Sequence, residues 1–404
     1  MLLDMERSPQ ILPARLEFLY TNIGRGHPFY LDGIAEALIR RGQINLVRRE
    51  RDVFEISRGV SQIAWRTARR LYRAGSSGGF AGFLYRRLRK DADYSRKGLL
   101  SYIMARDLRR EYLSLAGPVI VAHPSLVGFL AGHPMLCYQH GELVAPAESQ
   151  VVGAQIVFVP TEEVALSFLA AGYDRQSIVV TGLCIEPGLA RQAVDAFAAR
   201  VIRYGGLQPL TGAFFSSGAE PSQHVDTIAD AALSGLRNGH RVIVFAKRGG
   251  KLARAALHAM QQSRRNFAVV DKSNVFQMEL PSATIIEHSN RREENALTAR
   301  LFPTLDYFVA PAHERSNWAV GLGLPMFIVE PCIGPYAPLN RDELLRLGVA
   351  AVIGGSEAAK TFGSRVNDLR ASGQLETMAA ACWRAFPIDG FDRIATFLID
   401  RFSA

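Results

Sequence analysis

The chain contains 404 residues, of which 48% are hydrophobic and 21% are charged. This composition excludes an intrinsically disordered or low-complexity protein, and the length predicts two α/β domains or one large domain. The formal net charge is +9, but residues 40–110 contain 19 Lys and Arg against 6 Asp and Glu. The rest of the chain is therefore mildly acidic, and the positive charge belongs to one region.

The four cysteines lie far apart and form no Cys-x-x-Cys pair, which argues against a zinc site or a disulfide framework and indicates a reducing compartment. Residues 1–10 contain acidic side chains and no apolar core of a secretory signal. No run reaches the ~18–20 apolar residues that a membrane span needs. We therefore expect a cytoplasmic protein whose contact with a membrane is peripheral, at the inner face.

Short apolar runs alternate with helical periods along the whole chain, which is typical of parallel βαβ construction. In the first half, a buried strand over 16–20 is followed by a glycine-containing turn and a helix over 28–41. Another helix is expected over 161–171, with Thr161 as its N-cap. The other strands expected in this half cover 44–47, 118–122, 135–139, 156–160 and 178–181.

The second half repeats this alternation after a Pro- and Gly-containing stretch, residues 184–209, which has the composition of a linker. We expect an α/β fold of two facing Rossmann-like domains, residues 1–190 and 205–385, and a C-terminal helix within 386–404 that can cross back to the first domain. The expected strands of the second domain cover 212–215, 242–245, 267–270, 284–286, 307–310 and 326–329, and its expected helices include 223–237 and 251–262.

The turn after the first strand carries two glycines, Gly24 and Gly26, followed by His27 and Pro28. Ligands of open α/β sheets gather at the carboxyl ends of strands, so His27 is expected at the mouth of the crevice between the domains. The spacing is not the Gly-x-Gly-x-x-Gly of dinucleotide-binding folds, because Phe29 stands where the third glycine would be. A glycine turn with a surface histidine remains the alternative.

This turn and the segment Glu36-Ala37-Leu38 followed by Gly42 resemble the N-terminal loop and helix of the GT-B glycosyltransferases. The match is to the branch of the peptidoglycan N-acetylglucosaminyltransferase and the plant monogalactosyldiacylglycerol synthases. The resemblance implies that His27 is the general base or orients the acceptor, with Gly24 and Gly26 beside it. A neutral imidazole is suited to deprotonating a hydroxyl near pH 7.

A second set of matches lies in the second half, where these families bind the nucleotide-sugar donor. The strand-to-helix turn of Ser216, Ser217, Gly218 and Ala219 resembles their diphosphate-binding turn, whose backbone N–H groups bind anions. Residues 305–309 and 323–326, with Pro331, Gly334 and Asn340, follow in the same order as in these families. The resemblance therefore runs from residue 15 to about residue 350.

Departures from the family pattern affect the donor site. Trp318 stands where the relatives have a glutamate that binds the donor ribose, so Glu314 or Asn317 would have to supply the acceptor atoms from a shifted register. The turn before it contains His313 and Ser316 in place of a glycine-rich sequence. If neither Glu314 nor Asn317 binds the ribose, the donor is not a standard uridine diphosphate sugar, or the donor site is degenerate.

Other polar residues follow strands of both halves. The turn Lys247-Arg248-Gly249-Gly250 could neutralise phosphate, although a solvated basic turn is the slightly favoured interpretation. His288 lies in the loop that contacts the nucleobase in the relatives. In the first half, polar groups at the strand ends predict an acceptor site. These acceptor-side candidates are His123, Gln139, His140 and Glu142. No histidine spacing indicates a metal, and we expect neither a metal nor a permanently bound cofactor.

Residues 56–113 combine arginines with apolar bulk, and residues 63–73 have the spacing of a basic amphipathic helix. Such a helix is typical of proteins that bind an anionic membrane surface. A solvated basic face is the second interpretation. Nucleic acid is the third and the least favoured, because no nucleic-acid-binding motif accompanies the charge.

The sequence therefore predicts a peripheral GT-B glycosyltransferase. It would move a sugar from a nucleotide-diphosphate donor, a UDP-sugar in the first instance, to a hydroxyl of a lipid or small-molecule acceptor, with inversion by direct displacement. Two alternatives remain: a sugar-nucleotide epimerase of the same fold, which needs acidic residues in the crevice, and a non-catalytic binding or scaffold protein.

Overall fold

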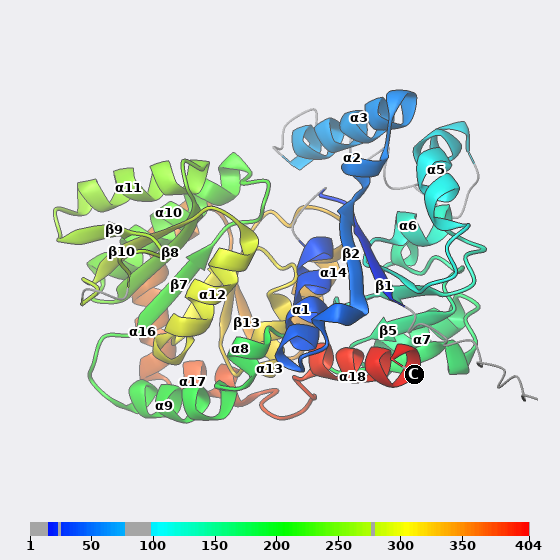
Figure 1. Cartoon of the computed structure of the whole chain (residues 1–404). Helices are drawn as coiled ribbons and strands as arrows, with labels where there is room; N and C mark the ends of the chain where they lie inside the picture. Colours follow the sequence, from blue (N-terminus) through cyan, green and yellow to red (C-terminus); the bar gives the residue numbers. More distant parts are fainter. Residues whose placement is uncertain (1–14, 23–25, 77–97, 276–278, 404) are drawn as a thin grey trace, which may run out of the picture.

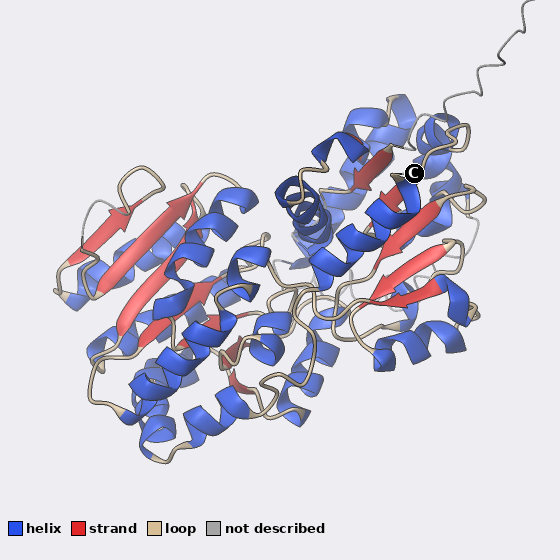
Figure 2. Cartoon of the chain, turned by 60° about the horizontal axis from the view of Figure 1, so that its bottom comes forward, coloured by secondary structure: helices blue, strands red, loops and turns tan. Residues whose placement is uncertain are grey.

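The computed structural model describes residues 15–22, 26–76, 98–275 and 279–403. They form two parallel β-sheets, each covered by helices on both faces, that lie side by side (Figures 1 and 2). The α/β architecture of two Rossmann-like domains expected from the sequence is confirmed.

The first sheet has six parallel strands in the order β2-β1-β3-β4-β5-β6. The expected strand over 44–47 is wrong, because Ile44–Leu46 is a 3-10 turn and the strand begins at Val47. This strand lies at the edge of the sheet and reads Val-Arg-Arg-Glu-Arg-Asp, so it lacks the apolar run that marks a central strand. The strands are β1 (Leu16–Tyr20), β2 (Val47–Asp52), β3 (Val119–Val121), β4 (Leu136–Gln139), β5 (Ile156–Val159) and β6 (Ile178–Val180).

The helices of the first domain begin and end close to the expected positions where the sequence carries a local signal. Thr161 caps α7 as predicted, because its Oγ1 accepts a 3.2 Å hydrogen bond from the backbone N–H of Val164. The helices are α1 (Gly26–Arg40), α2 (Val53–Ile56), α3 (Gly59–Ser76), α5 (Leu99–Tyr112), α6 (Pro124–Phe129) and α7 (Glu162–Ala170).

The second sheet has seven parallel strands in the order β13-β12-β11-β7-β8-β10-β9. The chain leaves β7 toward β8 on one side and later returns to β11 on the other, so the strand order reverses at β7. The first sheet reverses in the same way at β1. Ligands of open α/β sheets bind at such reversals, at the carboxyl ends of the strands. The strands are β7 (Thr211–Phe215), β8 (Arg241–Lys247), β9 (Phe267–Val270), β10 (Ala283–His288), β11 (Tyr307–Ala310), β12 (Met326–Val329) and β13 (Ala350–Ile353).

Both faces of the second sheet are covered, which explains why its central strands are continuously apolar. The covering helices are α10 (Ser222–Arg237), α11 (Lys251–Ser263), α12 (Arg291–Leu301), α13 (Ser316–Gly321), α14 (Tyr336–Arg346), α15 (Ser356–Lys360), α16 (Phe362–Ala371) and α17 (Gln374–Ala380).

The stretch with linker composition is largely helical. It contains α8 (Pro187–Ala190) and α9 (Ala193–Gly205). Arg200 of α9 is fully buried and donates hydrogen bonds to the carbonyls of Leu305 and Gly323, at 2.9 and 2.8 Å. These bonds fasten α9 to the second domain, because the buried guanidinium satisfies carbonyls that would otherwise lack donors.

The C-terminal helix α18 (Gly390–Phe402) returns to the first domain and packs against α1, as expected (Figure 1). Gly33 makes the close approach possible, since a Cβ there would lie only 2.3 Å from the Phe391 ring. Arg40 and Asp392 add a 2.8 Å ion pair between the two helices. Within the described residues, no helix combines the length and the apolar character that crossing a membrane requires.

Candidate functional site

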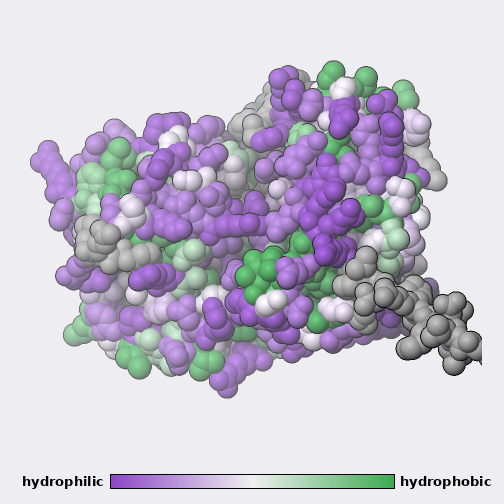
Figure 3. Space-filling model, in the orientation of Figure 1, coloured by the Kyte–Doolittle hydropathy of each residue, from purple (hydrophilic) through white to green (hydrophobic). Residues whose placement is uncertain are grey.

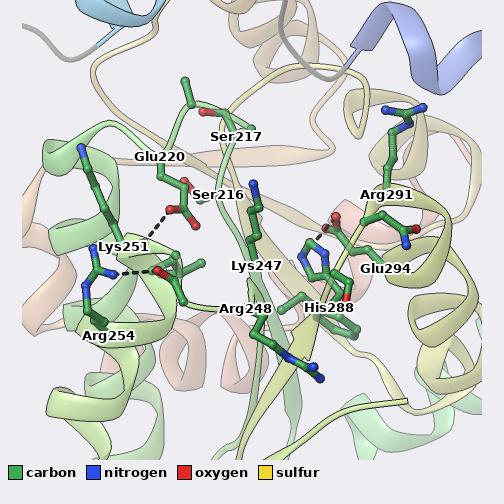
Figure 4. A pocket seen from close by; sticks show the side chains of 18 of the residues that line it. Ser216, Ser217, Glu220, Lys247, Arg248, Lys251, Arg254, His288, Arg291 and Glu294 are labelled. Carbon is green, nitrogen blue, oxygen red and sulfur yellow. Dashed lines mark hydrogen bonds and ion pairs between the residues drawn. The ribbon is translucent and has the colours of Figure 1, made fainter. Parts of the chain in front are cut away.

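A cavity of about 680 Å³ lies at the carboxyl ends of β7, β8 and β10, where the second sheet reverses its strand order (Figure 4). Its wall comes mainly from the second domain, and Asn22 and Arg69 of the first domain complete it. Six of the residues singled out from the sequence line it, namely Ser216, Ser217, Gly218, Ala219, Lys247 and His288.

The turn between β7 and α10 forms one side of this cavity. It closes with a 3.1 Å bond from the backbone N–H of Glu220 to the carbonyl of Ser217, and Glu220 has a φ of 44°. The Glu220 carboxylate accepts a 2.6 Å bond from the backbone N–H of Lys251, the first residue of α11 (Figure 4). The carboxylate of Glu220 therefore lies at the positive, N-terminal end of α11 and anchors the turn there.

The cavity is strongly cationic. Among the described lining residues, six carry a guanidinium or ammonium group and two carry a carboxylate, Glu220 and Glu294. Both carboxylates already have partners, since Glu294 Oε1 accepts a 2.5 Å bond from Arg315. Two of the cations are also paired, Arg248 with Asp271 and Arg291 with Asp32. The cations are Arg69, Lys247, Arg248, Lys251, Arg254 and Arg291. A surface of this kind attracts a ligand with several negative charges.

The floor of the cavity is rigid because of a buried network around Glu294. His288, at the end of β10, lies 3.4 Å from Glu294 through Nε2. Arg315 bonds the same carboxylate and its guanidinium lies 4.2 Å above the Phe215 ring. His288 therefore faces the cavity beside Glu294, as Figure 4 shows.

The first helix of the chain carries His27. His27 belongs to the first turn of α1, at the carboxyl end of β1, and Gly26 begins this helix. Gly24 lies outside the described residues. Asn22, which follows β1, lines the cavity, so the carboxyl end of β1 lies beside the predicted donor turn.

Five residues predicted for the donor site lie elsewhere, in the buried seam between the domains or next to it. Asn317 donates to the carbonyls of Gly141 and Cys184 at 3.0 and 3.4 Å. Asn340 donates to Glu142 at 3.1 Å. Within the described part of the chain, neither asparagine has a hydrogen-bond partner for its side-chain oxygen. The five residues are His313, Glu314, Ser316, Asn317 and Asn340, and none is among the cavity-lining residues of the described chain.

Glu142 is a buried carboxyl of this seam with a strongly raised pKa. Burial raises its pKa to about 7, and the nearby Glu314 acts in the same direction, against the lowering effect of Asn340 and Tyr30. A carboxyl in this range exchanges its proton near neutral pH.

The other acceptor-side candidates have structural partners. His123 caps α6, since its Nδ1 accepts from the backbone N–H of Ser125 at 3.1 Å. Gln139 donates to the sulfur of Cys184 at 3.2 Å, and the Nε2 of His140 lies 3.1 Å from the carbonyl of Val144. No group of three or more metal-ligating side chains occurs among the described residues.

The sequence did not predict most of the charged residues that line the cavity. Arg291 could have been found, because it follows Asn290, which caps α12 directly after β10. Lys251 and Arg254 lie on the first turn of α11, directly after the predicted phosphate-neutralising turn of residues 247–250. No local sequence pattern identifies Arg69 as a cavity residue, because it reaches the cavity from a helix of the other domain.

No protein-family model matches this chain, and no curated protein matches it in sequence. Solved structures match it over almost their whole length. One is described as a UDP-N-acetylglucosamine 2-epimerase from Listeria monocytogenes, with 13% identity, a TM-score of 0.53, and coverage of 97% of this chain and 98% of the other. The S. aureus MnaA–UDP complex has 12% identity, a TM-score of 0.50 and 96% coverage of both chains.

Medicago truncatula UGT71G1 complexed with UDP-glucose is similar to the same degree, with 11% identity, a TM-score of 0.50, and coverage of 96% of this chain and 99% of the other. The chain has the GT-B fold. At 11–13% identity the comparison establishes the fold alone, and the branch suggested by the sequence motifs stays a prediction.

Proposed function

We propose that this protein is a glycosyltransferase that takes a sugar from a nucleotide-diphosphate donor and transfers it to an acceptor hydroxyl. The observation that carries the proposal is the cationic cavity at the reversal point of the second sheet, bounded by the turn of residues 216–219. Backbone N–H groups of such a turn and the surrounding cations suit a diphosphate, which carries two or more negative charges.

In this proposal the acceptor hydroxyl gives its proton to His27 as its oxygen forms a bond to the anomeric carbon of the sugar. The bond from that carbon to the diphosphate oxygen breaks, and the diphosphate leaves with the electron pair. Lys247 and the turn of residues 216–219 stabilise the charge that develops on the leaving group. No metal and no bound cofactor are part of the scheme.

The surface of α3 and α5 supports an acceptor at an anionic membrane. Large apolar side chains are exposed there next to exposed arginines, and Figure 3 shows hydrophobic patches among hydrophilic ones at the top of the first domain. Such a mixed surface complements anionic headgroups and the acyl chains beneath them. The exposed apolar residues are Val60, Ile63, Leu71, Leu99, Leu100 and Tyr102, and exposed arginines include Arg58, Arg66, Arg70, Arg106 and Arg110.

Flotation with vesicles tests this part of the proposal. We expect the protein to float with phosphatidylglycerol vesicles and not with phosphatidylcholine vesicles, and we expect an Ile63→Glu and Leu100→Glu double variant to stay unbound. Equal failure of the wild type on both vesicles would remove the membrane from the proposal and leave a soluble acceptor.

A specific observation favours epimerisation of a nucleotide sugar as the second candidate. Glu142, with a pKa of about 7, and Glu294 bring carboxyl groups to the crevice region, as acid–base chemistry on a sugar carbon requires. The third candidate is a binding protein without catalysis, which the burial of Trp318 at the family's glutamate position supports.

Two measurements separate the three candidates. Calorimetry with UDP, dTDP, GDP and CDP tests donor binding, and absence of heat with all four contradicts the proposed function. Mass spectrometry and NMR of a UDP-sugar panel incubated with acceptors then distinguish release of UDP with a new glycoside from an epimerised but intact nucleotide sugar. Binding without either product favours the non-catalytic candidate.

A further inference from the structure

The helix α3 carries arginines on two different faces. Trp65 is buried and donates a 3.1 Å hydrogen bond from its indole nitrogen to the carbonyl of Met104, which anchors α3 to α5. Arg69 follows one turn later on the same face, is partly buried, and lines the cavity. Arg66 and Arg70 lie on the outer face and are exposed.

The guanidinium of Arg69 is held in place before any ligand arrives. Its central carbon lies 5.1 Å from the centre of the Phe54 ring, and that ring meets Trp65 edge to face at 6.2 Å. The carboxylate of Asp52 caps α2 through the backbone N–H of Phe54 and attracts Arg69 electrostatically. A side chain with such supports loses little conformational freedom on binding.

Arg69 is the cation that the first domain contributes to the cavity wall within the described residues. The other cations and the turn of residues 216–219 belong to the second domain. A ligand held by that turn and also bonded by Arg69 would therefore touch both domains. The planar fork of an arginine is suited to two phosphate oxygens at once, which a lysine cannot match.

We propose that Arg69 binds the diphosphate of the nucleotide donor from the first domain, across the crevice from the turn of residues 216–219. The inference rests on the proposed function, because it assigns a phosphate-binding role within the same cavity. Arg69 belongs to α3, whose exposed side presents basic and apolar side chains to solvent.

Calorimetry with three probes tests the assignment, namely UDP, inorganic pyrophosphate and uridine. For Arg69→Ala we expect affinity for UDP and for pyrophosphate to fall at least about tenfold, with the affinity for uridine unchanged. Arg69→Lys should recover part of the loss. Arg175→Ala is the matched control, because this exposed arginine of the first domain lies outside the cavity wall, and it should bind all three probes as the wild type does.

The outcomes separate this inference from the proposed function. Wild-type binding of UDP with no change in Arg69→Ala overturns the role of Arg69 and leaves the proposed function intact. Binding of pyrophosphate but of no nucleotide by the wild type contradicts the proposed function, while a tenfold loss in Arg69→Ala still supports the phosphate contact. An equal loss for uridine, a lowered melting temperature, or absence of binding to every probe overturns the inference.

Discussion

The indole nitrogen of Trp318 donates a 2.7 Å hydrogen bond to the carboxylate of Glu186, which joins α13 to the chain just before α8. Trp318 is 1% exposed, and its ring packs edge to face against Phe215 at 5.6 Å. The position at which the sequence resemblance predicts a ribose-binding glutamate is therefore filled by a core residue that ties the second domain to the interdomain segment.

Introducing a glutamate at position 318 should destabilise the protein. Trp318→Glu would place a carboxylate in the core beside Glu186, so we expect a loss of about 3–5 kcal/mol in the free energy of unfolding and no gain in UDP affinity. Trp318→Phe keeps the ring and loses the hydrogen bond, at a cost of about 1–3 kcal/mol. Chemical denaturation and calorimetry measure both. An unchanged stability with tighter UDP binding in Trp318→Glu would contradict the assignment.

Glu142 should make stability depend on pH. Its pKa rises from 4.5 to about 7 on folding, so the stability it contributes is fully present below pH 4.5 and is lost as the pH rises through 7. Relative to Glu142→Gln, the wild type should lose up to about 3 kcal/mol across this window. The buried His224 and His313, whose pKa values burial lowers, act in the opposite direction but equally in both proteins.

Urea denaturation of the wild type and of Glu142→Gln, at pH values from 4.5 to 8, measures this difference. Glutamine keeps the oxygen that accepts from Asn340, so it is a fair mimic of the protonated acid. A difference that stays constant with pH would mean that Glu142 does not titrate in the folded protein.

The charges around the cavity predict opposite effects of two substitutions on donor affinity. Lys247→Ala removes a cation and should weaken UDP binding by about tenfold, whereas Glu220→Gln removes a carboxylate and should strengthen it severalfold. Glu220→Gln should also cost about 1 kcal/mol, because the carboxylate at the N-terminus of α11 is lost. Lys272→Ala, at an exposed position outside the cavity wall, is the control. Calorimetry at low salt reports all three, and effects of the same sign for Lys247 and Glu220 would refute the charge argument.

Asp32 of α1 should hold the two domains together. Its carboxylate pairs with Arg291 and, at 3.0 Å, with Arg292, and Arg292 also pairs with Glu50 at 2.6 Å. We expect Asp32→Ala to increase the radius of gyration at low ionic strength, and we expect high salt to bring the wild type toward the variant because it screens the pairs. Small-angle X-ray scattering measures this. Glu357→Ala removes an ion pair with Lys360 inside the second domain and should leave the scattering curve unchanged.

Much of the fold follows from local sequence signals. Apolar runs predicted central strands such as β5 and β11, Thr161 predicted the start of α7, and the amphipathic pattern of the last residues predicted α18. These signals suffice because a strand buried on both faces must be apolar, and a helix end needs a side chain to satisfy its free N–H groups. The sequence did not predict the bounds of the edge strand β2, because the exposed face of an edge strand tolerates charged residues.

The charge shows most clearly what the sequence alone determined and what it left open. Counting residues located the positive excess in the first half and suggested that the donor domain is not basic. The fold nevertheless gathers Lys247, Lys251, Arg254 and Arg291 around one cavity, and adds Arg69 from the other domain. Electrostatic interaction depends on distance in space and on burial, which the order of residues does not record. The local sequence therefore determines the strands and turns. The cationic site and the burial of Trp318 depend on the tertiary structure, which brings residues of both domains into contact.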